Sequence, residues 1–507
     1  MEFTLNKIPL GTLCAQPDTV SEQPVDIDFT LPDYCPDIEK ILKCKITPKI
    51  YNRALSGGQL TVDGATVVTI LYTDASGGLR VCEQTVPYSV AFPVKDTPEC
   101  YALDTYTKPE YVNCRALSQR RLTVHGAFSL YARVLQSCPV ELCSPCEESA
   151  LEYNTSEIPA SSLSAFCSEQ FTAGDGIKVT NKPSVAVVLD SSVRADVTGF
   201  KLIPDKLMLN GELAVHMLYL SAPDSGSVET LDYTIPFTEV IDCRGLTEES
   251  EVCPVLSVLS YEIRLKNDIM SESPIVDVEA RLNALVTAYS RKNVTVILDA
   301  YSTELAVVPE LSQIKVPFNT TVLSDTFIHK DTLDDLELGE IIDIRADVVP
   351  LTPSLGEKSI TLGARMSVQI LGRNTDGELV YLERSKEISR EIITEQDFEN
   401  VESCSVSVVS LSYRMGENNT VEIRLELRYC VTVCETRQLS AVTAVTADES
   451  AKLTRKPCAL ILYYADEGER IWDIAKFYNI SVSSVARENE LAEDVLSAPR
   501  MLLIPTA

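Results

Sequence analysis

Apolar and polar residues alternate with a period of two along most of the first 450 residues, which is the pattern of half-buried β-strands. The segment QLTVDGATVVTILYTDASGGLRV (59–81) predicts two strand runs joined by a glycine-containing bend and followed by a hairpin turn at Ser76-Gly77-Gly78. Similar phrases recur at 120–135, 205–220 and 358–371, and more diverged copies at 273–289 and 419–433. This part of the chain is therefore predicted to be mainly β.

The phrases repeat at a regular spacing. Gly64 aligns with Gly211 and Ala364, which are 147 and then 153 residues further along the chain. A second phrase keeps the same phase, at Gly126, Glu279 and Leu425. Six β units are thus expected as three tandem pairs, with one pair in roughly 150 residues, enough for each pair to hold its own core.

Turn and charged residues gather at 137–162, 299–313 and 446–457, and we predict linkers there. The expected domains are 1–150, which includes an N-terminal segment, 163–300, 312–445, which is the most diverged repeat, and 459–507. Two patches, 31–45 and 329–340, also fit short helices that would open the first and third pairs.

The periodicity changes in the C-terminal segment 459–507. Ile471, Ile474, Ala475 and Tyr478 follow the i, i+3, i+4, i+7 spacing of one helix face, and Ser481 is placed to cap a second helix. Apolar runs at 458–464 and 500–505 flank these helices as strands. The prediction is a small βααβ module, joined to the repeats by a charged linker that few apolar contacts cross. Its Trp472, the only tryptophan of the chain, is expected to pack partly beneath the first helix rather than stand exposed.

Charge and cysteine usage limit the classes of function. The chain has 74 acidic and 44 basic residues, a formal charge of −30, which argues against binding nucleic acid or anionic membrane surfaces. No apolar stretch reaches the roughly 18 residues that span a bilayer, so direct membrane insertion is not expected. The start lacks a secretory signal pattern, so a cytoplasmic location is expected. The 16 cysteines are expected to be reduced, because such a chain needs no disulfide framework.

Motifs for catalysis are not found. The three histidines fit structural roles, and the chain has no phosphate-binding loop, dinucleotide fingerprint, HExxH motif or nucleophile elbow. The acidic pairs Glu147-Glu148 and Asp334-Asp335 lie in charged runs and do not indicate an acid–base couple. We therefore expect no enzyme activity, no cofactor and no catalytic residue. Cys138, Cys143 and Cys146 leave a zinc site open as an alternative to a linker that merely contains cysteines.

Two segments of the first repeat carry a resemblance to a known family. FTLPDYCPDIEKILKCKI (29–46), followed by LTVDGATVVTILYTDASGGLRVCEQTVPYSVAF (60–92), resembles the SPOCS domain of endospore-forming anaerobes. The second repeat keeps DKLMLNG and TIPFTEV, whereas the third loses the proline–aromatic pair. The resemblance implies a non-enzymatic module for assembly of the spore envelope.

The C-terminal segment resembles a LysM domain. The matching positions are Tyr464, Gly468, Ile471, Trp472, Ile474, Ala475, Asn489, Leu491, Leu502, Ile504 and Pro505. In LysM domains a shallow groove between two loops, here 465–471 and 489–499, binds glycans that contain N-acetylglucosamine. The resemblance places partner or glycan contacts at Gly468, Glu469, Arg470, Ile471, Asn489 and Leu491. Glu469-Arg470 replaces the usual Asp-Thr, which argues against sugar binding.

SPOCS repeats followed by a LysM module occur together in a spore-coat morphogenetic protein. That combination implies a scaffold at the forespore surface, in the mother-cell cytoplasm. The implied partners are the coat ATPase, stage IV sporulation protein A, which the LysM module would bind, and other coat proteins. The alternatives are a protein that binds peptidoglycan or cortex, and an enzyme with a cryptic site in the β repeats.

Overall fold

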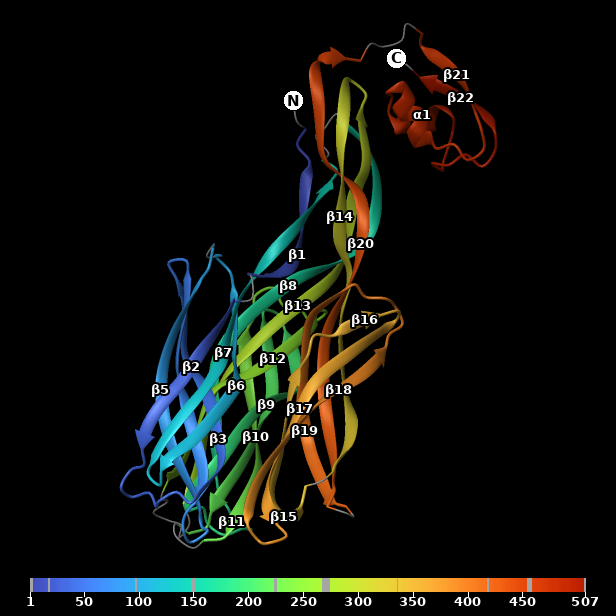
Figure 1. Ribbon diagram of the computed structural model, residues 1–507. Helices are drawn as coiled ribbons and strands as arrows, with labels where there is room; N and C mark the ends of the chain where they lie inside the picture. Colours follow the sequence, from blue (N-terminus) through green and yellow to red (C-terminus); the bar gives the residue numbers. More distant parts are fainter. Residues whose placement is uncertain are drawn as a thin grey trace.

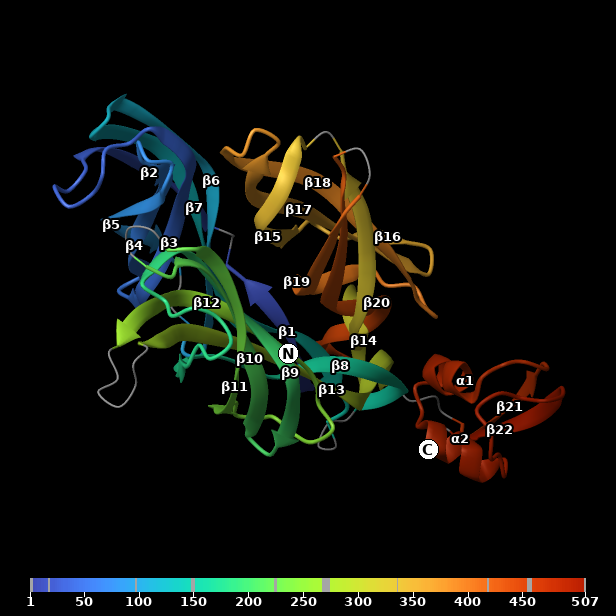
Figure 2. The ribbon, with the colours of Figure 1, turned by 90° about the horizontal axis from the view of Figure 1, so that it is seen from below.

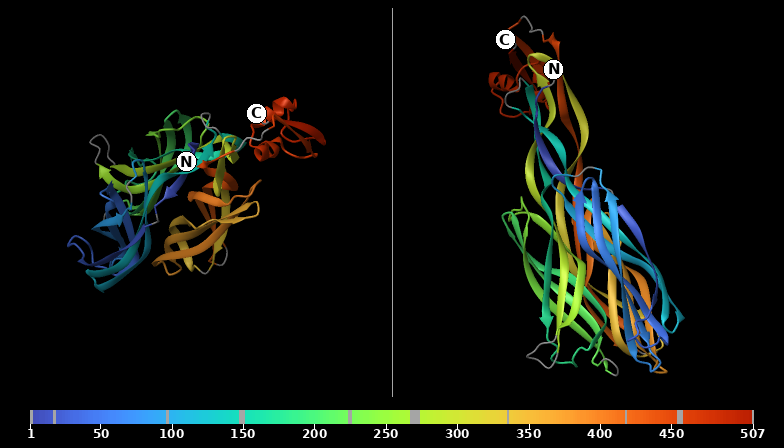
Figure 3. Two further views of the ribbon diagram at one scale, coloured as in Figure 1. Left: turned by 90° about the horizontal axis from the view of Figure 1, so that it is seen from above. Right: turned by 90° about the vertical axis from the view of Figure 1, so that its left-hand side faces the viewer.

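The computed structural model describes residues 3–16, 19–95, 98–146, 151–222, 226–266, 274–334, 336–416, 419–453 and 458–505. These residues form 22 strands and two short helices, so the prediction of a mainly β chain is confirmed. The molecule is elongated: a broad body narrows into a stalk, and the C-terminal module lies beside the stalk tip (Figures 1 and 3). No helix in the described part of the chain is long and apolar enough to cross a membrane.

The body consists of three units, and each unit packs two antiparallel sheets against each other. One sheet, here called the meander sheet, has three consecutive strands in order. These are β3 (Lys40–Ser56), β4 (Gln59–Thr73) and β5 (Leu79–Pro93) in unit 1, β9 (Val187–Ile203), β10 (Lys206–Leu220) and β11 (Val228–Asp242) in unit 2, and β15 (Leu338–Pro350), β17 (Ser359–Asn374) and β18 (Leu379–Ile393) in unit 3. The short β16 (Ser354–Gly356) also pairs with β17.

The second sheet of each unit, the long-strand sheet, is built around the last strand of that unit. These sheets are β2 (Thr19–Thr30), β7 (Arg121–Ser144) and β6 (Ala102–Ser118) in unit 1, β8 (Leu151–Ile177), β13 (Ile275–Ser302) and β12 (Glu251–Lys266) in unit 2, and β14 (Leu305–Leu333), β20 (Val421–Lys452) and β19 (Asn400–Met415) in unit 3. In unit 1 two strands, β1 (Asn6–Ala15) and β2, pair with β7. In units 2 and 3 one long strand takes their place: β8 pairs with β13, and β14 pairs with β20.

The three units surround a common axis (Figure 2). Far from the stalk, Leu71, Leu218 and Leu371, from the central strands β4, β10 and β17, share one buried cluster. At the other end the long strands leave the body as three ribbons that twist together into the stalk (Figure 1). Apolar side chains from all three ribbons form its core, for example Leu142, Val296 and Val316.

Two expectations about local structure are wrong. The predicted linkers 137–162, 299–313 and 446–457 are largely strand, because their described residues belong to β7, β8, β13, β14 and β20. Residues 454–457, and Glu147-Glu148, lie outside the described residues. No helix forms at 31–45 or in the described part of 329–340, where β3, β14 and β15 run instead. In these segments, pairing with strands distant in sequence overrides the local turn and helix signals.

The C-terminal elements form where the periodicity places them. β21 (Leu460–Ala465) pairs with β22 (Arg500–Pro505), and α1 (Ile471–Tyr478) and α2 (Val482–Glu488) lie between them in sequence. The Ser481 hydroxyl accepts a hydrogen bond from the Ser484 backbone N–H, so the predicted cap of the second helix is confirmed. Ile471, Ile474 and Ala475 are buried on one face of α1.

A glycine facing an aromatic ring recurs in the meander sheets. Gly64 of β4 lies opposite Tyr88, and Gly211 of β10 lies opposite Phe237. A Cβ at Gly64 would overlap the carbonyl oxygen of Lys49 and come within 2.6 Å of the Tyr88 ring, and a Cβ at Gly211 would overlap the Phe237 ring and come within 2.9 Å of the Asp196 carbonyl oxygen. The third unit has Ala364 opposite Ile388 at this position, so the smaller partner leaves space for a methyl group.

This pairing predicts that Gly211→Ala lowers stability by about 1–3 kcal/mol through overpacking. We expect a lower thermal midpoint for the full chain, and partial recovery in Gly211→Ala/Phe237→Ile, which copies the third unit. Gly199→Ala on β9 is the control, because a Cβ there meets nothing within 4 Å. Equal midpoints for the two single variants would show that the ring does not require the glycine.

Candidate binding sites: the axial cavity and the C-terminal module

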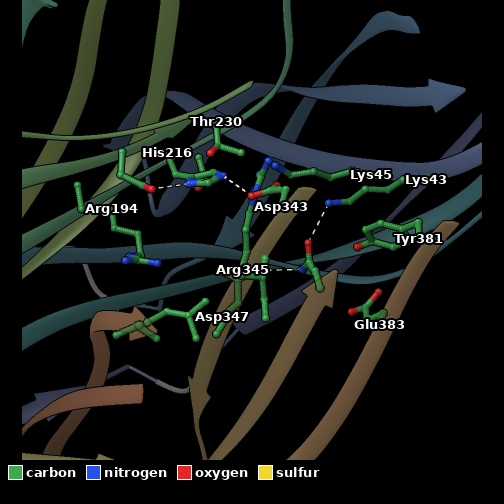
Figure 4. A pocket seen from close by; sticks show the side chains of 18 of the residues that line it. Lys43, Lys45, Arg194, His216, Thr230, Asp343, Arg345, Asp347, Tyr381 and Glu383 are labelled. Atoms are coloured by element: carbon green, nitrogen blue, oxygen red, sulfur yellow. Dashed lines mark hydrogen bonds and ion pairs between the residues drawn. The ribbon is translucent and has the colours of Figure 1, made fainter. Parts of the chain in front are cut away.

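A cavity of about 1080 Å³ lies between the three units. Its walls come from β3 and β6 of unit 1, β9, β10 and β11 of unit 2, and β15, β17, β18 and β19 of unit 3. Figure 4 shows that charged side chains from all three units point into this region. The cavity is therefore a product of how the units pack together, and no single unit contains it.

The charges beside the cavity occupy equivalent positions in the repeats. Lys43, Asp190 and Asp343 lie opposite Leu71, Leu218 and Leu371, respectively, which are the leucines of the axial cluster. The residues two positions further along these strands are Lys45, Ser192 and Arg345. Both sets follow the same steps of 147 and 153 residues as Gly64, Gly211 and Ala364. The regular spacing of the repeats thus marks this cluster in the sequence, although no catalytic or binding motif contains it.

Asp190 of unit 2 connects the three units. Its carboxylate accepts charged hydrogen bonds from Lys43 Nζ at 3.2 Å and Lys45 Nζ at 3.1 Å, both of unit 1. Arg345 Nη1 of unit 3 lies 3.1 Å from the same carboxylate. One buried carboxylate therefore holds three cations from two other units, a geometry in which the pairs offset the cost of burial.

The network continues toward unit 3 through Asp343. Arg345 Nε donates to Asp343 at 3.0 Å, and His216 Nε2 of unit 2 lies 2.9 Å from the same carboxylate. His216 Nδ1 lies 2.6 Å from Asp232. Burial disfavours the imidazolium, but the two carboxylates outweigh it and raise the pKa of His216.

The electrostatics of the buried groups follow from this arrangement. Burial opposes ionisation of Asp190, yet Lys45, Arg345 and Lys43 hold its pKa well below the usual range. For Lys43 burial is the larger effect, and its pKa is lowered despite the attraction of Asp190. The Lys43 ammonium also lies 4.9 Å from the centre of the Tyr381 ring.

Removing the charge of Asp190 is expected to weaken the packing of the three units. In Asp190→Asn, three cations lose their shared carboxylate, which should cost about 3–5 kcal/mol, as for other broken buried pairs. The measurement is the thermal midpoint of the full chain, with Asp376→Asn as the matched control because Asp376 is exposed and lies outside the network. If both variants melt like the parent, the network does not hold the units together.

The six residues predicted to contact a partner or glycan occupy different environments. Gly468 is exposed and has a positive φ of 87°, and the Glu469 carboxylate accepts hydrogen bonds from the Tyr463 hydroxyl and the Asp466 backbone. Arg470 is half-buried and pairs with Asp494 at 3.0 Å. These three residues lie in the loop before α1, where Gly468 is exposed and the other two are half-buried.

The other three predicted contacts point into the module. Ile471 is only 2% exposed and belongs to the core of the module, with Leu491 packed against that core. Asn489 is buried: its side-chain amide donates to Val485 O and Leu503 O and accepts from Leu503 N, which ties α2 to β22. Ile471→Glu would therefore bury a charge and is not a surface change.

The module is docked on the stalk through α1. Trp472 is 5% exposed and lies edge-on to Tyr301 of β13, with ring centres 4.9 Å apart. Its indole N–H donates to Asp299 at 3.1 Å, and Lys476 Nζ donates to the same carboxylate at 2.5 Å. The Tyr301 hydroxyl donates to Ile480 O at 2.6 Å. Tyr301 and Val307 are the described stalk residues that join the apolar core of the module, so the apolar contact between module and repeats is small, as expected.

Because Trp472 is the only tryptophan, its fluorescence reports this contact directly. Asp299→Ala and Tyr301→Ala should shift its emission to longer wavelength, because the indole loses its acceptor or its apolar cover. A loss of about 2 kcal/mol, typical of an interface anchor, raises the undocked population about 30-fold. Asp473→Ala, on the exposed side of α1, is the control. Unchanged emission in both stalk variants would mean that the module alone buries Trp472.

The three cysteines weighed as a zinc site do not gather. Cys138 and Cys143 lie on β7, and their odd spacing directs them to opposite faces of the strand. The Cys143 thiol donates to Thr443 O. Within the described ranges, no group of three or more His, Cys, Asp or Glu side chains is placed to hold a metal ion, and all 16 cysteines are free thiols.

Comparison with known families gives one match. The family model described as the SPOCS domain of SipL matches residues 37–117 and 184–266. These ranges contain β3–β6 of unit 1 and β9–β12 of unit 2, so each match takes in a meander sheet and the first strand after it. No curated protein and no solved structure matches the chain. The two matched segments are SPOCS domains, which is consistent with a SipL-like SPOCS protein.

Proposed function

We propose that this protein is a non-enzymatic scaffold of the spore coat that acts in the mother-cell cytoplasm, at the forespore surface. The observation that carries the proposal is the pair of SPOCS domains, which relates the chain to sporulation and to the coat. The unmatched unit 3 has the same order of strands as units 1 and 2, which supports its reading as a third, diverged SPOCS repeat.

The C-terminal module is proposed to be a LysM domain that binds the coat ATPase, stage IV sporulation protein A. Its βααβ order and strand pairing support this assignment. Docking at the stalk tip keeps the module apart from the body, so the two ends of the molecule can engage different proteins (Figure 1). Other coat proteins would then bind the SPOCS units.

The charge of the module favours a protein partner over a glycan. Between residues 459 and 507 there are eight acidic and four basic residues. Two of the basic side chains, Arg470 and Lys476, are already paired with Asp494 and Asp299. Glu469, at the usual sugar-binding loop, is held by Tyr463 and the backbone and is not free for a sugar hydroxyl.

The test is capture of the purified ATPase by the full chain. Arg470→Glu should weaken capture more than tenfold, which corresponds to about 1.4 kcal/mol at one interface position. Arg487→Glu makes the same charge change on an exposed site of α2 and should leave capture unchanged. Unaltered tryptophan emission and thermal midpoint must accompany the result, since Arg470 also approaches Asn154 of the stalk.

A glycan-binding experiment tests the alternative function, binding of peptidoglycan or cortex. We expect no binding of chitin oligomers or peptidoglycan fragments at micromolar concentration by calorimetry. Glycan binding together with no capture of the ATPase would replace the scaffold proposal by a cortex-binding one. Capture that Arg470→Glu does not weaken would keep the partner and move its site away from this loop.

A further inference from the structure

The axial cavity contains hydrogen-bond donors that the protein does not use. Arg194 of β9 lines the cavity, and its Nε is buried without a hydrogen-bond partner. No ion pair or hydrogen bond joins the half-buried side chain of Arg194 to the described residues. The Tyr381 hydroxyl of β18 lines the same cavity and is also buried without a partner. Buried donors left without an acceptor are costly, so their presence needs an explanation.

The carboxylates around the cavity are already engaged. Each of the four exposed acidic residues of its lining has a partner: Glu110 accepts from Lys108, Asp232 from His216, Asp347 from Gln369 and Glu383 from Ser367. Unsatisfied groups in this cavity are therefore donors, while the acceptors are occupied. Among the described charged residues of the lining, Arg194 is the one whose side chain has no hydrogen bond or ion pair.

The buried charges point the same way. Four cationic side chains line the cavity, and Asp190 and Asp343 hold three of them, Lys43, Lys45 and Arg345, which leaves Arg194 as the cation without a carboxylate partner among the described residues. In Figure 4 Arg194 and Tyr381 lie on opposite sides of the network.

We propose that the axial cavity binds a small organic oxyanion, a molecule that bears carboxylate or phosphate groups, with Arg194 as its main contact. The planar guanidinium of arginine matches both oxyanions through paired N–H donors. The Tyr381 hydroxyl donates to a second part of the ligand. A volume of about 1080 Å³ exceeds a single phosphate ion and suits a larger molecule.

This site differs from the surface proposed for the coat partner. It lies between the SPOCS units and not on the C-terminal module, and it can be tested on the full chain without any other protein. Because all three units form its walls, an anion bound there would stabilise the packed arrangement of the units through linkage.

The test follows the thermal midpoint of the full chain during titration with sodium phosphate and, separately, sodium citrate. Sodium chloride at the same ionic strength is the reference. A bound oxyanion raises the midpoint saturably, and the response to phosphate or citrate tells which chemistry fits. Arg194→Gln should weaken the response at least tenfold, and Tyr381→Phe should weaken it less. Arg424→Gln, at an exposed position of β20, should respond like the parent.

Two results would overturn the proposal. One is a midpoint that rises without saturation and equally in Arg194→Gln, since phosphate and citrate also stabilise proteins by exclusion from their surface. The other is no rise beyond that in chloride. If Arg194→Gln does not fold, Tyr381→Phe and Arg194→Lys carry the comparison: a response unchanged in both would exclude the site.

Discussion

The carboxylate of Asp190 is the contact on which the arrangement of the three units depends. It binds Lys43 and Lys45 of unit 1 and Arg345 of unit 3, so it joins all three units at their common axis. Three identical repeats would place three like charges at this position, and burying them together would be strongly unfavourable. The repeats instead carry Lys43, Asp190 and Asp343 there. Their divergence makes the units complementary, and this complementarity favours closure within one chain over association of identical copies.

The arrangement of the three units around one axis also brings together the strands that form the stalk. Each unit sends its long strands in the same direction, and these strands meet as ribbons only because the units surround one axis (Figure 2). The buried hydrogen bond between Ser161 of β8 and Thr320 of β14 joins two of these ribbons. Asp299 and Tyr301 lie near the end of one ribbon, where they hold Trp472 and Lys476. The module is thus held by the long-strand sheets, which pack against the meander sheets that carry the axial charges.

Elements that depend on local periodicity could be predicted from the sequence. Contacts between residues that lie far apart in the chain could not. Alternation indicated the strands, and the spacing of Ile471, Ile474 and Ala475 predicted α1 correctly. The stretches taken for linkers have turn-rich composition, yet they become strands because other long strands pair with them. Trp472 looked like a residue of one small module, but its hydrogen-bond acceptor is 173 residues earlier in the chain. Ile471 was placed at the surface by resemblance, and the helix geometry directs it inward.

The third unit contributes charges to the axis but lacks the glycine–aromatic pair that the first two units have. Units 1 and 2 have an aromatic ring opposite Gly64 and Gly211, respectively. At the equivalent position unit 3 has Ala364 opposite Ile388. This region lies outside the residues matched by the SPOCS family model. Unit 3 nevertheless supplies Asp343 and Arg345 to the axis. The glycine–aromatic pair therefore governs packing within a sheet and can be replaced by a smaller pair. The axial charges govern contact between units, where changing one member leaves the others unpaired in a buried site.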